Sequence, residues 1–169
     1  MSSRGDLIRQ YENLYIIRSL TKLFALPGIR MGYVLSAPDN ISRIMRQLPE
    51  WNLPVTAEAA VIAGMEVLEK TDYLQRTQAL IAAEREYLTH VLEEAGLHVI
   101  RSDAPYLLLR GPGMLCDALL SRGILIRDCR DFPGLAEGMY RIAVKEHAVC
   151  ETFCRILKEV LYEAGDDKT

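Results

Sequence analysis

The sequence contains no long apolar segment and no cluster of like charges. No run approaches the roughly 18 consecutive apolar residues of a membrane-spanning helix, and no signal-peptide pattern opens the chain. Lysine and arginine form no basic block, and the formal net charge is −3, which argues against nucleic acid as a main partner. Internal repeats and low-complexity segments are absent as well. We therefore expect a cytoplasmic protein that associates with neither nucleic acid nor a membrane.

Residues that bind metal ions are few. The chain has three histidines and four cysteines, and their spacing matches no metal-binding pattern. We therefore predict no metal site. The cysteines are expected to be buried or half-buried thiols in a reducing compartment; they are Cys116, Cys129, Cys150 and Cys154.

What the sequence does contain is typical of a globular protein. Its 169 residues are 50% hydrophobic and 25% charged, which fits one or two small domains. In residues 1–71 the hydrophobic pattern predicts two strands, Leu14–Ile17 and Met31–Leu35, the first of them buried. Helices are expected from Ser2 or Ser3 to about Tyr11, from Asn40 to Gln47, and from Thr56 to about Glu69.

Residues 72–164 predict a compact α+β domain, with a small sheet that has helices on one face. It begins with a long helix, Asp72–Ala95, which Gly96 ends. The other predicted elements are strands at His98–Ile100, Tyr106–Leu109, Ile124–Arg127 and Tyr140–Val144, and helices at Met114–Ser121 and Glu146–Glu163. The polar tail, residues 165–169, is expected to be disordered. The boundary between the two parts is expected within the long helix, without a flexible linker.

The segment Ser19–Tyr33 joins the first two predicted strands and carries the chemistry. Lys22 follows the first strand, and Pro27-Gly28 predicts a tight turn. Desolvation can lower the pKa of a buried or half-buried lysine, and the amine then becomes a nucleophile toward carbonyl groups. Ser19 and Arg30 add a hydroxyl and a cation, two groups that hold a phosphate. From spacing alone, however, a lysine beside apolar residues is more often an ordinary surface residue.

This segment resembles the lysine segment of fold-type I enzymes that depend on pyridoxal 5'-phosphate, in the aminotransferase branch. The resemblance rests on Ser19-x-x-Lys22 followed by Pro27-Gly28-x-Arg30-x-Gly32-Tyr33. It implies that Lys22 forms the covalent link to pyridoxal 5'-phosphate, and that Ser19 and Arg30 hold the cofactor phosphate. It also implies an α/β fold of the pyridoxal-phosphate-dependent transferase type, of which this chain holds the end of the large domain (residues 1–71, including the start of the interdomain helix) and the small α+β domain (residues 72–164).

Other parts of that family pattern are missing. The resemblance implies an upstream glycine-containing loop, a ring-stacking aromatic residue and an aspartate for the cofactor nitrogen, none of which has a counterpart here. We therefore expect the 169-residue chain to be catalytically silent on its own, and to form a homodimer that covers its exposed strands. Two alternatives of another class also stay open. The chain could be a non-catalytic C-terminal piece that only folds and self-associates, or it could be a generic interaction domain.

Two arginines form a second group of interest. Arg127 and Arg141 each lie within apolar, strand-like segments, and arginine is suited to bidentate capture of carboxylate or phosphate. The simplest interpretation pairs them on the surface with Asp128, Asp131 or Glu137. The resemblance instead implies that Arg141 binds a substrate carboxylate and Arg127 a second anion, as in members that act on phosphorylated amino compounds.

That combination resembles two related enzymes, threonine-phosphate decarboxylase and histidinol-phosphate aminotransferase. Three segments resemble the decarboxylase in particular: Tyr106–Arg110, Ile124–Cys129 and Phe132–Leu135. The Gly-Thr pair common after the Arg141 strand in the aminotransferases is absent from Ile142-Ala143-Val144-Lys145. The resemblance therefore favours decarboxylation of L-threonine O-3-phosphate to aminopropanol phosphate, a step in cobalamin biosynthesis, with the aminotransferase as the alternative. In either case the implied partner is a small phosphorylated amino substrate.

Overall fold

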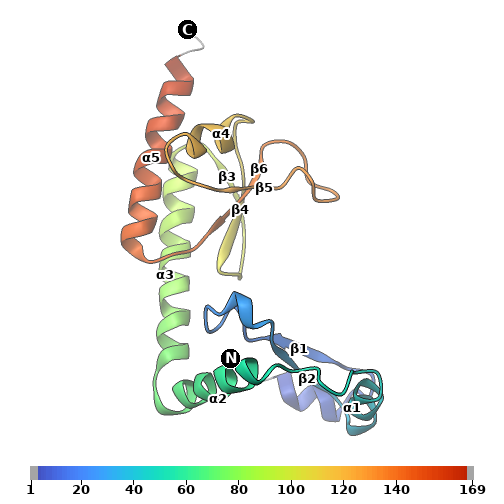
Figure 1. Cartoon of the computed structure of the whole chain (residues 1–169). Coiled ribbons are helices and arrows are strands. Elements are labelled where there is room, and N and C mark those ends of the chain that lie inside the picture. The colour runs from blue at the N-terminus through green and yellow to red at the C-terminus, as the bar shows by residue number, and fades with distance from the viewer. Residues whose placement is uncertain (1–3, 167–169) are drawn as a thin grey trace. The chain divides into compact units, whose positions relative to one another are not determined.

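The computed structural model describes residues 4–166, and the chain divides into two compact units, residues 1–73 and 74–169 (Figure 1). Thr71 separates the last helix of the first unit, α2 (Val55–Lys70), from α3 (Tyr73–Glu94). Its hydroxyl donates to the Val67 carbonyl at 2.6 Å and accepts from the Tyr73 N–H at 3.2 Å. One side chain therefore ends one helix and caps the next. Because α3 begins at Tyr73, residues 1–71 contain no part of that helix.

The first unit contains a two-stranded antiparallel sheet, β1 (Ile16–Ser19) and β2 (Gly32–Leu35), with helix α1 (Pro38–Met45) and α2 (Figure 1). A 3-10 helix, Arg4–Arg9, replaces the predicted first helix; Ser2 and Ser3 lie outside the described residues. The prediction of a buried first strand is wrong: among the described residues β1 pairs with β2 alone, Ile16 is half-buried, and Ile17 is 75% exposed.

Glycine at position 32 permits the pairing of β1 with β2. Ser19 lies opposite Gly32 in the register. A Cβ atom at Gly32 would lie 2.4 Å from the carbonyl oxygen of Arg18, a distance that no side chain tolerates. The end of β1 that leads to Lys22 is therefore held directly against β2.

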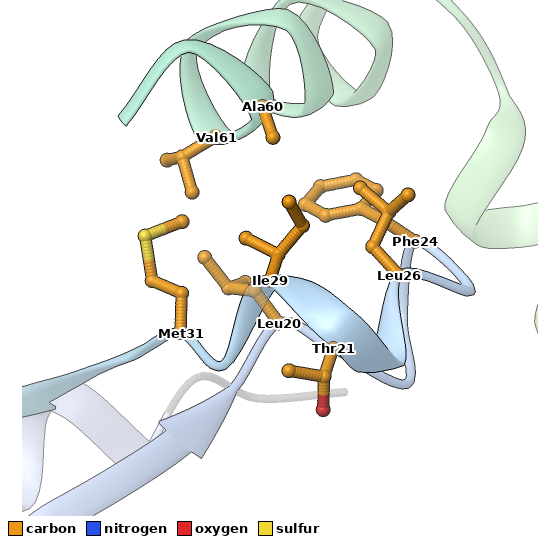
Figure 2. Close-up of a pocket in the computed structure, with 8 residues that line it drawn as sticks. All are labelled: Leu20, Thr21, Phe24, Leu26, Ile29, Met31, Ala60 and Val61. Carbon is orange, nitrogen blue, oxygen red and sulfur yellow. The ribbon is translucent and has the colours of Figure 1, made fainter. Parts of the chain in front are cut away.

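The lysine loop, residues 20–31, packs against α2. Figure 2 shows Leu20, Phe24 and Ile29 directed toward Ala60 and Val61 of this helix. The space left between them is about 10 Å³, about enough for one water molecule. A Cβ atom at Gly64 would approach the Phe24 ring to 2.7 Å, so the small residue at 64 is needed for this contact.

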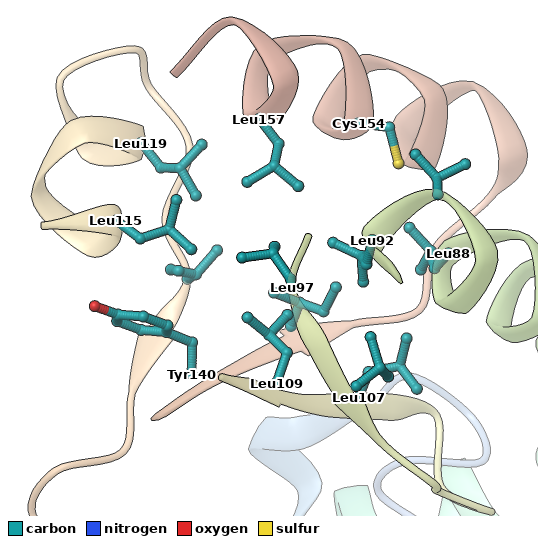
Figure 3. Close-up of a cluster of buried hydrophobic side chains, with 14 of the residues drawn as sticks. Leu88, Leu92, Leu97, Leu107, Leu109, Leu115, Leu119, Tyr140, Cys154 and Leu157 are labelled. Carbon is teal, nitrogen blue, oxygen red and sulfur yellow. The ribbon is translucent and has the colours of Figure 1, made fainter. Parts of the chain in front are cut away.

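The second unit is a four-stranded antiparallel sheet of order β3-β4-β6-β5, with helices packed on one face. The strands are β3 (His98–Ile100), β4 (Tyr106–Arg110), β5 (Arg127–Asp128) and β6 (Met139–Ala143), and the helices are α3, α4 (Leu115–Leu120) and α5 (His147–Asp166). Alternate strand residues point into the core, as the two-residue period of a strand requires. Figure 3 shows them meeting leucines from all three helices.

Two sequence predictions in this unit need correction. The strand predicted at Ile124–Arg127 is reduced to Arg127–Asp128, because the Ile124 N–H donates to the Leu119 carbonyl at 2.9 Å and so closes the end of α4 rather than extending the sheet. The predicted tail is also shorter, since α5 continues through Gly165 to Asp166; no proline or capping residue stops it earlier. Residues 167–169 lie outside the described part of the chain.

The four cysteines are free thiols, and three of them are buried, as predicted. Burial raises the pKa of Cys129, Cys150 and Cys154, which keeps them protonated and unreactive. Among residues 4–166, no group of three or more histidine, cysteine or acidic side chains is placed to hold a metal ion. The helices in that range include none both long and apolar enough to cross a bilayer.

The start of α5 is tied to α3 by a histidine and a buried glutamate. His147 Nδ1 lies 3.1 Å from both carboxylate oxygens of Glu84, and its Nε2 lies 3.5 Å from Glu151. The Tyr87 ring packs edge-on against the imidazole at 5.0 Å between centroids. The hydrogen bond to Glu84 holds the pKa of His147 above its usual value, and partial burial opposes this only in part.

We expect this pair to make stability depend on pH. A raised folded-state pKa means that the contribution is fully present below the unfolded pKa of about 6.5 and is lost as pH rises through the folded value. The difference in unfolding free energy between the wild type and His147→Gln should therefore shrink from about pH 6 to pH 8. Urea denaturation at several pH values measures it. His90→Gln, which removes an exposed pair with Glu94 on α3, is the control; an equal pH dependence in both variants would contradict the assignment.

Candidate functional site

The lysine loop presents polar groups on the side that does not pack on α2. Thr21 is buried, and Figure 2 shows its hydroxyl directed away from the apolar contact. That hydroxyl lies 2.8 Å from Ser19 Oγ. The structure therefore places two hydroxyls together at the end of β1, directly before Lys22. Thr21 was not predicted as a site residue, although the Ser-x-Thr spacing at a strand end was the available signal.

Lys22 itself is exposed, not buried or half-buried as the sequence argument assumed. Within residues 4–166 its ammonium group has no hydrogen-bond or ion-pair partner. Its backbone is fixed nevertheless, since the Ala25 N–H donates to the Lys22 carbonyl at 3.3 Å and the Leu26 N–H to the Thr21 carbonyl at 2.9 Å. The loop therefore fixes the backbone at Lys22 and leaves its side chain exposed.

Arg30 ends the loop in an unusual backbone conformation. Both Arg30 and Ala25 have φ of 53°, in the left-handed region that residues other than glycine seldom occupy. Such conformations concentrate at functional sites, where the surrounding structure enforces them. The Arg30 guanidinium donates to the Pro27 carbonyl at 3.2 Å. In the described part of the chain no hydrogen bond joins Ser19, Lys22 and Arg30 to one another.

The donor set of this loop fits a phosphate-bearing aldehyde. Two hydroxyls and a guanidinium can donate to phosphate oxygens, and an exposed amine can attack a carbonyl carbon. No carboxylate of the loop competes for these donors, because residues 19–31 contain none. The small apolar space under the loop excludes a cofactor there, so any ligand lies on the hydroxyl side.

In the second unit, the structure brings Arg127 and Arg141 together. They lie directly opposite each other in the β5–β6 pair, so both side chains project from the sheet face that carries no helix. The Arg127 guanidinium lies over the Phe132 ring at 5.4 Å, and that of Arg141 over the Tyr106 ring at 5.2 Å. Like charges in register repel each other, so this arrangement favours a bound anion.

The surface ion-pair interpretation is correct for only one of these arginines. Arg127 pairs with Asp131. Asp128 pairs with Arg130 instead, through three hydrogen bonds of 2.5–3.0 Å, and these bonds hold the pKa of Asp128 below its usual value. Arg141 has no acidic partner among residues 4–166. The aromatic partners Phe132 and Tyr106 were not predicted.

The fold and these two groups describe a class: an α/β protein with a loop that carries a lysine, two paired hydroxyls and an arginine, and a small sheet that carries two arginines in register. The profile of the family "Aminotransferase class I and II" matches residues 3–157. The chain belongs to this family, whose members depend on pyridoxal phosphate, and the predicted fold class is confirmed.

The relatives of this chain carry the names of two different enzymes. A histidinol-phosphate aminotransferase of Methanosphaera stadtmanae is 36% identical over 163 residues, covering 92% of this chain and 44% of the relative. A threonine-phosphate decarboxylase of Salmonella typhimurium is 34% identical over 159 residues, covering 91% of this chain and 43% of the relative. The crystal structure of a histidinol-phosphate aminotransferase from Clostridium acetobutylicum superposes with a TM-score of 0.85 at 34% identity, covering 96% of this chain and 50% of that one. The chain thus spans at most about half the length of these relatives.

Proposed function

We propose that this chain forms part of a pyridoxal-phosphate-dependent enzyme that decarboxylates L-threonine O-3-phosphate. The observation that carries the proposal is the register of Arg127 opposite Arg141 on an exposed sheet face. Two adjacent cations suit a substrate with two anionic groups, and this substrate carries a carboxylate and a phosphate ester. The lysine loop supports the cofactor side of the proposal.

Each group of the lysine loop has a role in this proposal. Lys22 Nζ would hold the cofactor covalently, and the hydroxyls of Ser19 and Thr21 with the guanidinium of Arg30 would hold its phosphate. Pyridoxal phosphate supplies an electron sink when bound. The hydroxyls of Ser19 and Thr21 lie 2.8 Å apart, and each can rotate to donate a hydrogen bond to a phosphate oxygen.

The arginines would select the bond that breaks. Whichever bond at the amino carbon stands perpendicular to the cofactor ring is the one that is cleaved, and a carboxylate gripped by Arg141 fixes that orientation. The Tyr106 ring under Arg141 limits the positions of the guanidinium. Orientation of a bound substrate by fixed charges is a recognised source of rate enhancement.

A second candidate is an aminotransferase acting on histidinol phosphate. Two relatives named histidinol-phosphate aminotransferase favour it: the sequence relative that is 36% identical and the solved structure that is 34% identical. The lysine loop serves both reactions equally. The two candidates differ in what leaves the carbon that bears the amine. The decarboxylase removes CO2, and the aminotransferase removes a proton, which Lys22 Nζ is suited to accept.

The proposal predicts a large effect of removing Arg141. In the full gene product that carries this chain, Arg141→Ala should lower kcat/KM for CO2 release from L-threonine O-3-phosphate by at least about thirtyfold, because losing a charge-assisted contact costs about 2–5 kcal/mol. Arg155→Ala, which removes an exposed ion pair with Glu159 on α5, is the matched control. Amino transfer without CO2 release would favour the second candidate. Unchanged kinetics in Arg141→Ala would assign this arginine a structural role only.

A further inference from the structure

One hydrogen bond from a helix outside the lysine loop reaches the backbone beside Lys22. Tyr73, the first residue of α3, donates its hydroxyl to the Leu23 carbonyl at 2.8 Å. Both residues belong to the first unit, although 50 positions separate them. Among residues 4–166, no other hydrogen bond joins the lysine loop to a helix outside it. Neither the sequence motif nor the set of cofactor donors includes this tyrosine.

The Leu23–Phe24 peptide is held at both of its polar ends. Its carbonyl accepts from Tyr73, and its N–H donates to the Leu20 carbonyl at 3.1 Å. The second of these bonds closes the turn that contains Lys22. A rotation of this peptide would therefore open that turn, and the Tyr73 hydroxyl opposes the rotation. Without the hydroxyl, the partly buried Leu23 carbonyl would lack a donor among residues 4–166, a cost that rotation toward water would relieve.

The loop needs such support because its backbone is not relaxed. Ala25 has φ of 53°, and a left-handed value of this kind persists in a non-glycine residue only where neighbouring contacts enforce it. The carbonyls of Thr21 and Lys22 accept from N–H groups of the loop itself, at 2.9 and 3.3 Å. The next carbonyl, that of Leu23, takes its donor from Tyr73 instead. One contact that keeps this part of the loop in place therefore comes from α3.

Tyr73 is itself fixed by contacts other than this bond. Its N–H donates to the Thr71 hydroxyl at 3.2 Å. Its ring lies beside that of Phe24, with 6.4 Å between centroids and 30° between planes. Phe24 in turn packs on α2 (Figure 2), where Gly64 leaves room for its ring. The ring at position 73 should therefore stay in place without its hydroxyl, so that Tyr73→Phe removes the hydrogen bond alone.

We propose that Tyr73 is a positioning residue for the attachment of a carbonyl cofactor to Lys22. Its hydroxyl fixes the turn from which the lysine side chain extends, and so keeps the amine within reach of an aldehyde that the phosphate donors of the loop hold. Prior orientation of two reacting groups is a large part of what makes such a step favourable.

The attachment step itself is simple in its atoms. The amine nitrogen bonds to the aldehyde carbon, and the aldehyde oxygen leaves as water with the two amine hydrogens. Tyr73 takes no part in this exchange and acts only through the backbone. The inference rests on the role of Lys22 in the proposed function, and it holds for either candidate substrate.

The hydrogen bond can be observed at a single carbonyl. Of the three phenylalanines, Phe24 alone follows a leucine. The 169-residue chain, labelled with 13C at leucine carbonyls and 15N at phenylalanine, therefore gives one carbonyl–nitrogen NMR correlation, from the Leu23–Phe24 peptide. In Tyr73→Phe this 13C resonance should move upfield, as a carbonyl does when it loses a hydrogen bond. An unchanged resonance would overturn the proposal.

The positioning role is measured as cofactor attachment. The full gene product, freed of cofactor, is equilibrated with pyridoxal phosphate at a series of concentrations and reduced with borohydride, and the label on the Lys22 peptide is quantified. The concentration that gives half-maximal labelling should rise about two- to tenfold in Tyr73→Phe, the fold-change equivalent to one hydrogen bond. Full labelling should return at saturating cofactor, because the lysine is still present.

Tyr140→Phe is the matched control, because it removes another tyrosine hydroxyl bonded to backbone carbonyls, those of Pro112 and Gly113 at 2.8 Å, in the second unit. A general loss of stability would weaken labelling in both variants, whereas the proposed role weakens it in Tyr73→Phe alone. An equal change in the two variants, or no change in Tyr73→Phe, would overturn the proposal and leave Lys22 assigned. Absence of label on Lys22 in the wild type would instead refute the lysine assignment and this inference with it.

Discussion

Lys22→Ala should abolish covalent attachment of pyridoxal phosphate and, with it, all turnover of the full gene product. The expected loss is complete because no other amine lies in the lysine loop, and a carbonyl cofactor can be held covalently only by an unprotonated amine at the correct position. Borohydride reduction followed by peptide mapping measures the attachment. In the wild type, the label should be found on the peptide that contains Lys22.

This substitution leaves the fold intact, which makes its result interpretable. Lys22 is exposed and has no side-chain partner within residues 4–166, and surface substitutions of that kind change stability by about 0.5 kcal/mol or less. Lys70→Ala is the control: Lys70 is also exposed, in the same unit, and pairs with Glu66 at 2.9 Å. It should retain full labelling. A label on Lys70, Lys145 or Lys158 of the wild type would refute the assignment of Lys22.

The sequence predicted well those features that depend on neighbours along the chain. The helices, and the two strands around the lysine loop, follow from the hydrophobic period and the turn residues. Most of their observed ends lie within a few positions of the predicted ones. Two small residues of α2, Ala60 and Gly64, allow it to pack closely on the lysine loop, whereas Ala59 and Ala63 are exposed.

Features that depend on distant partners could not be predicted in the same way. The buried Glu84 is hydrogen-bonded to His147, 63 residues away, and nothing within α3 reveals this partner. Asp128 and Asp131 are equally plausible partners of Arg127 in the sequence, and only the path of the turn decides between them. Ile124–Ile126 has the composition of a strand, but its first N–H is used by α4.

Several sequence predictions stay predictions. The roles of Ser19, Lys22, Arg30, Arg127 and Arg141 depend on ligands, and the homodimer and the cytoplasmic location depend on partners and compartments. The structure adds one contact to each group of site residues: Thr21 is hydrogen-bonded to Ser19, and Asp131 forms an ion pair with Arg127. Substituting Thr21 or Asp131 therefore tests these contacts separately from catalysis.

The second unit also has a core position where a large loss of stability is expected. Leu92 of α3 is fully buried among side chains from α5 and the sheet. Leu92→Ala should reduce the unfolding free energy by about 2–5 kcal/mol, because it removes buried methyl groups and leaves a cavity that the surrounding helices fill only in part. For a domain whose total stability is about 5–15 kcal/mol, this is a large fraction. Urea denaturation, followed by circular dichroism, measures it.

Leu125→Ala is the matched control, because it makes the same chemical change in the same unit at a side chain that is 80% exposed; its effect should be about 0.5 kcal/mol or less. The core variant should also weaken anion binding. Tyr140 and Ile142 enter the core on either side of Arg141 in β6, so loosening the core releases the strand that positions this arginine. Equal losses of stability in the two variants would show that Leu92 does not lie in the core of the folded unit, and the placement of Arg141 by that core would then have to be abandoned.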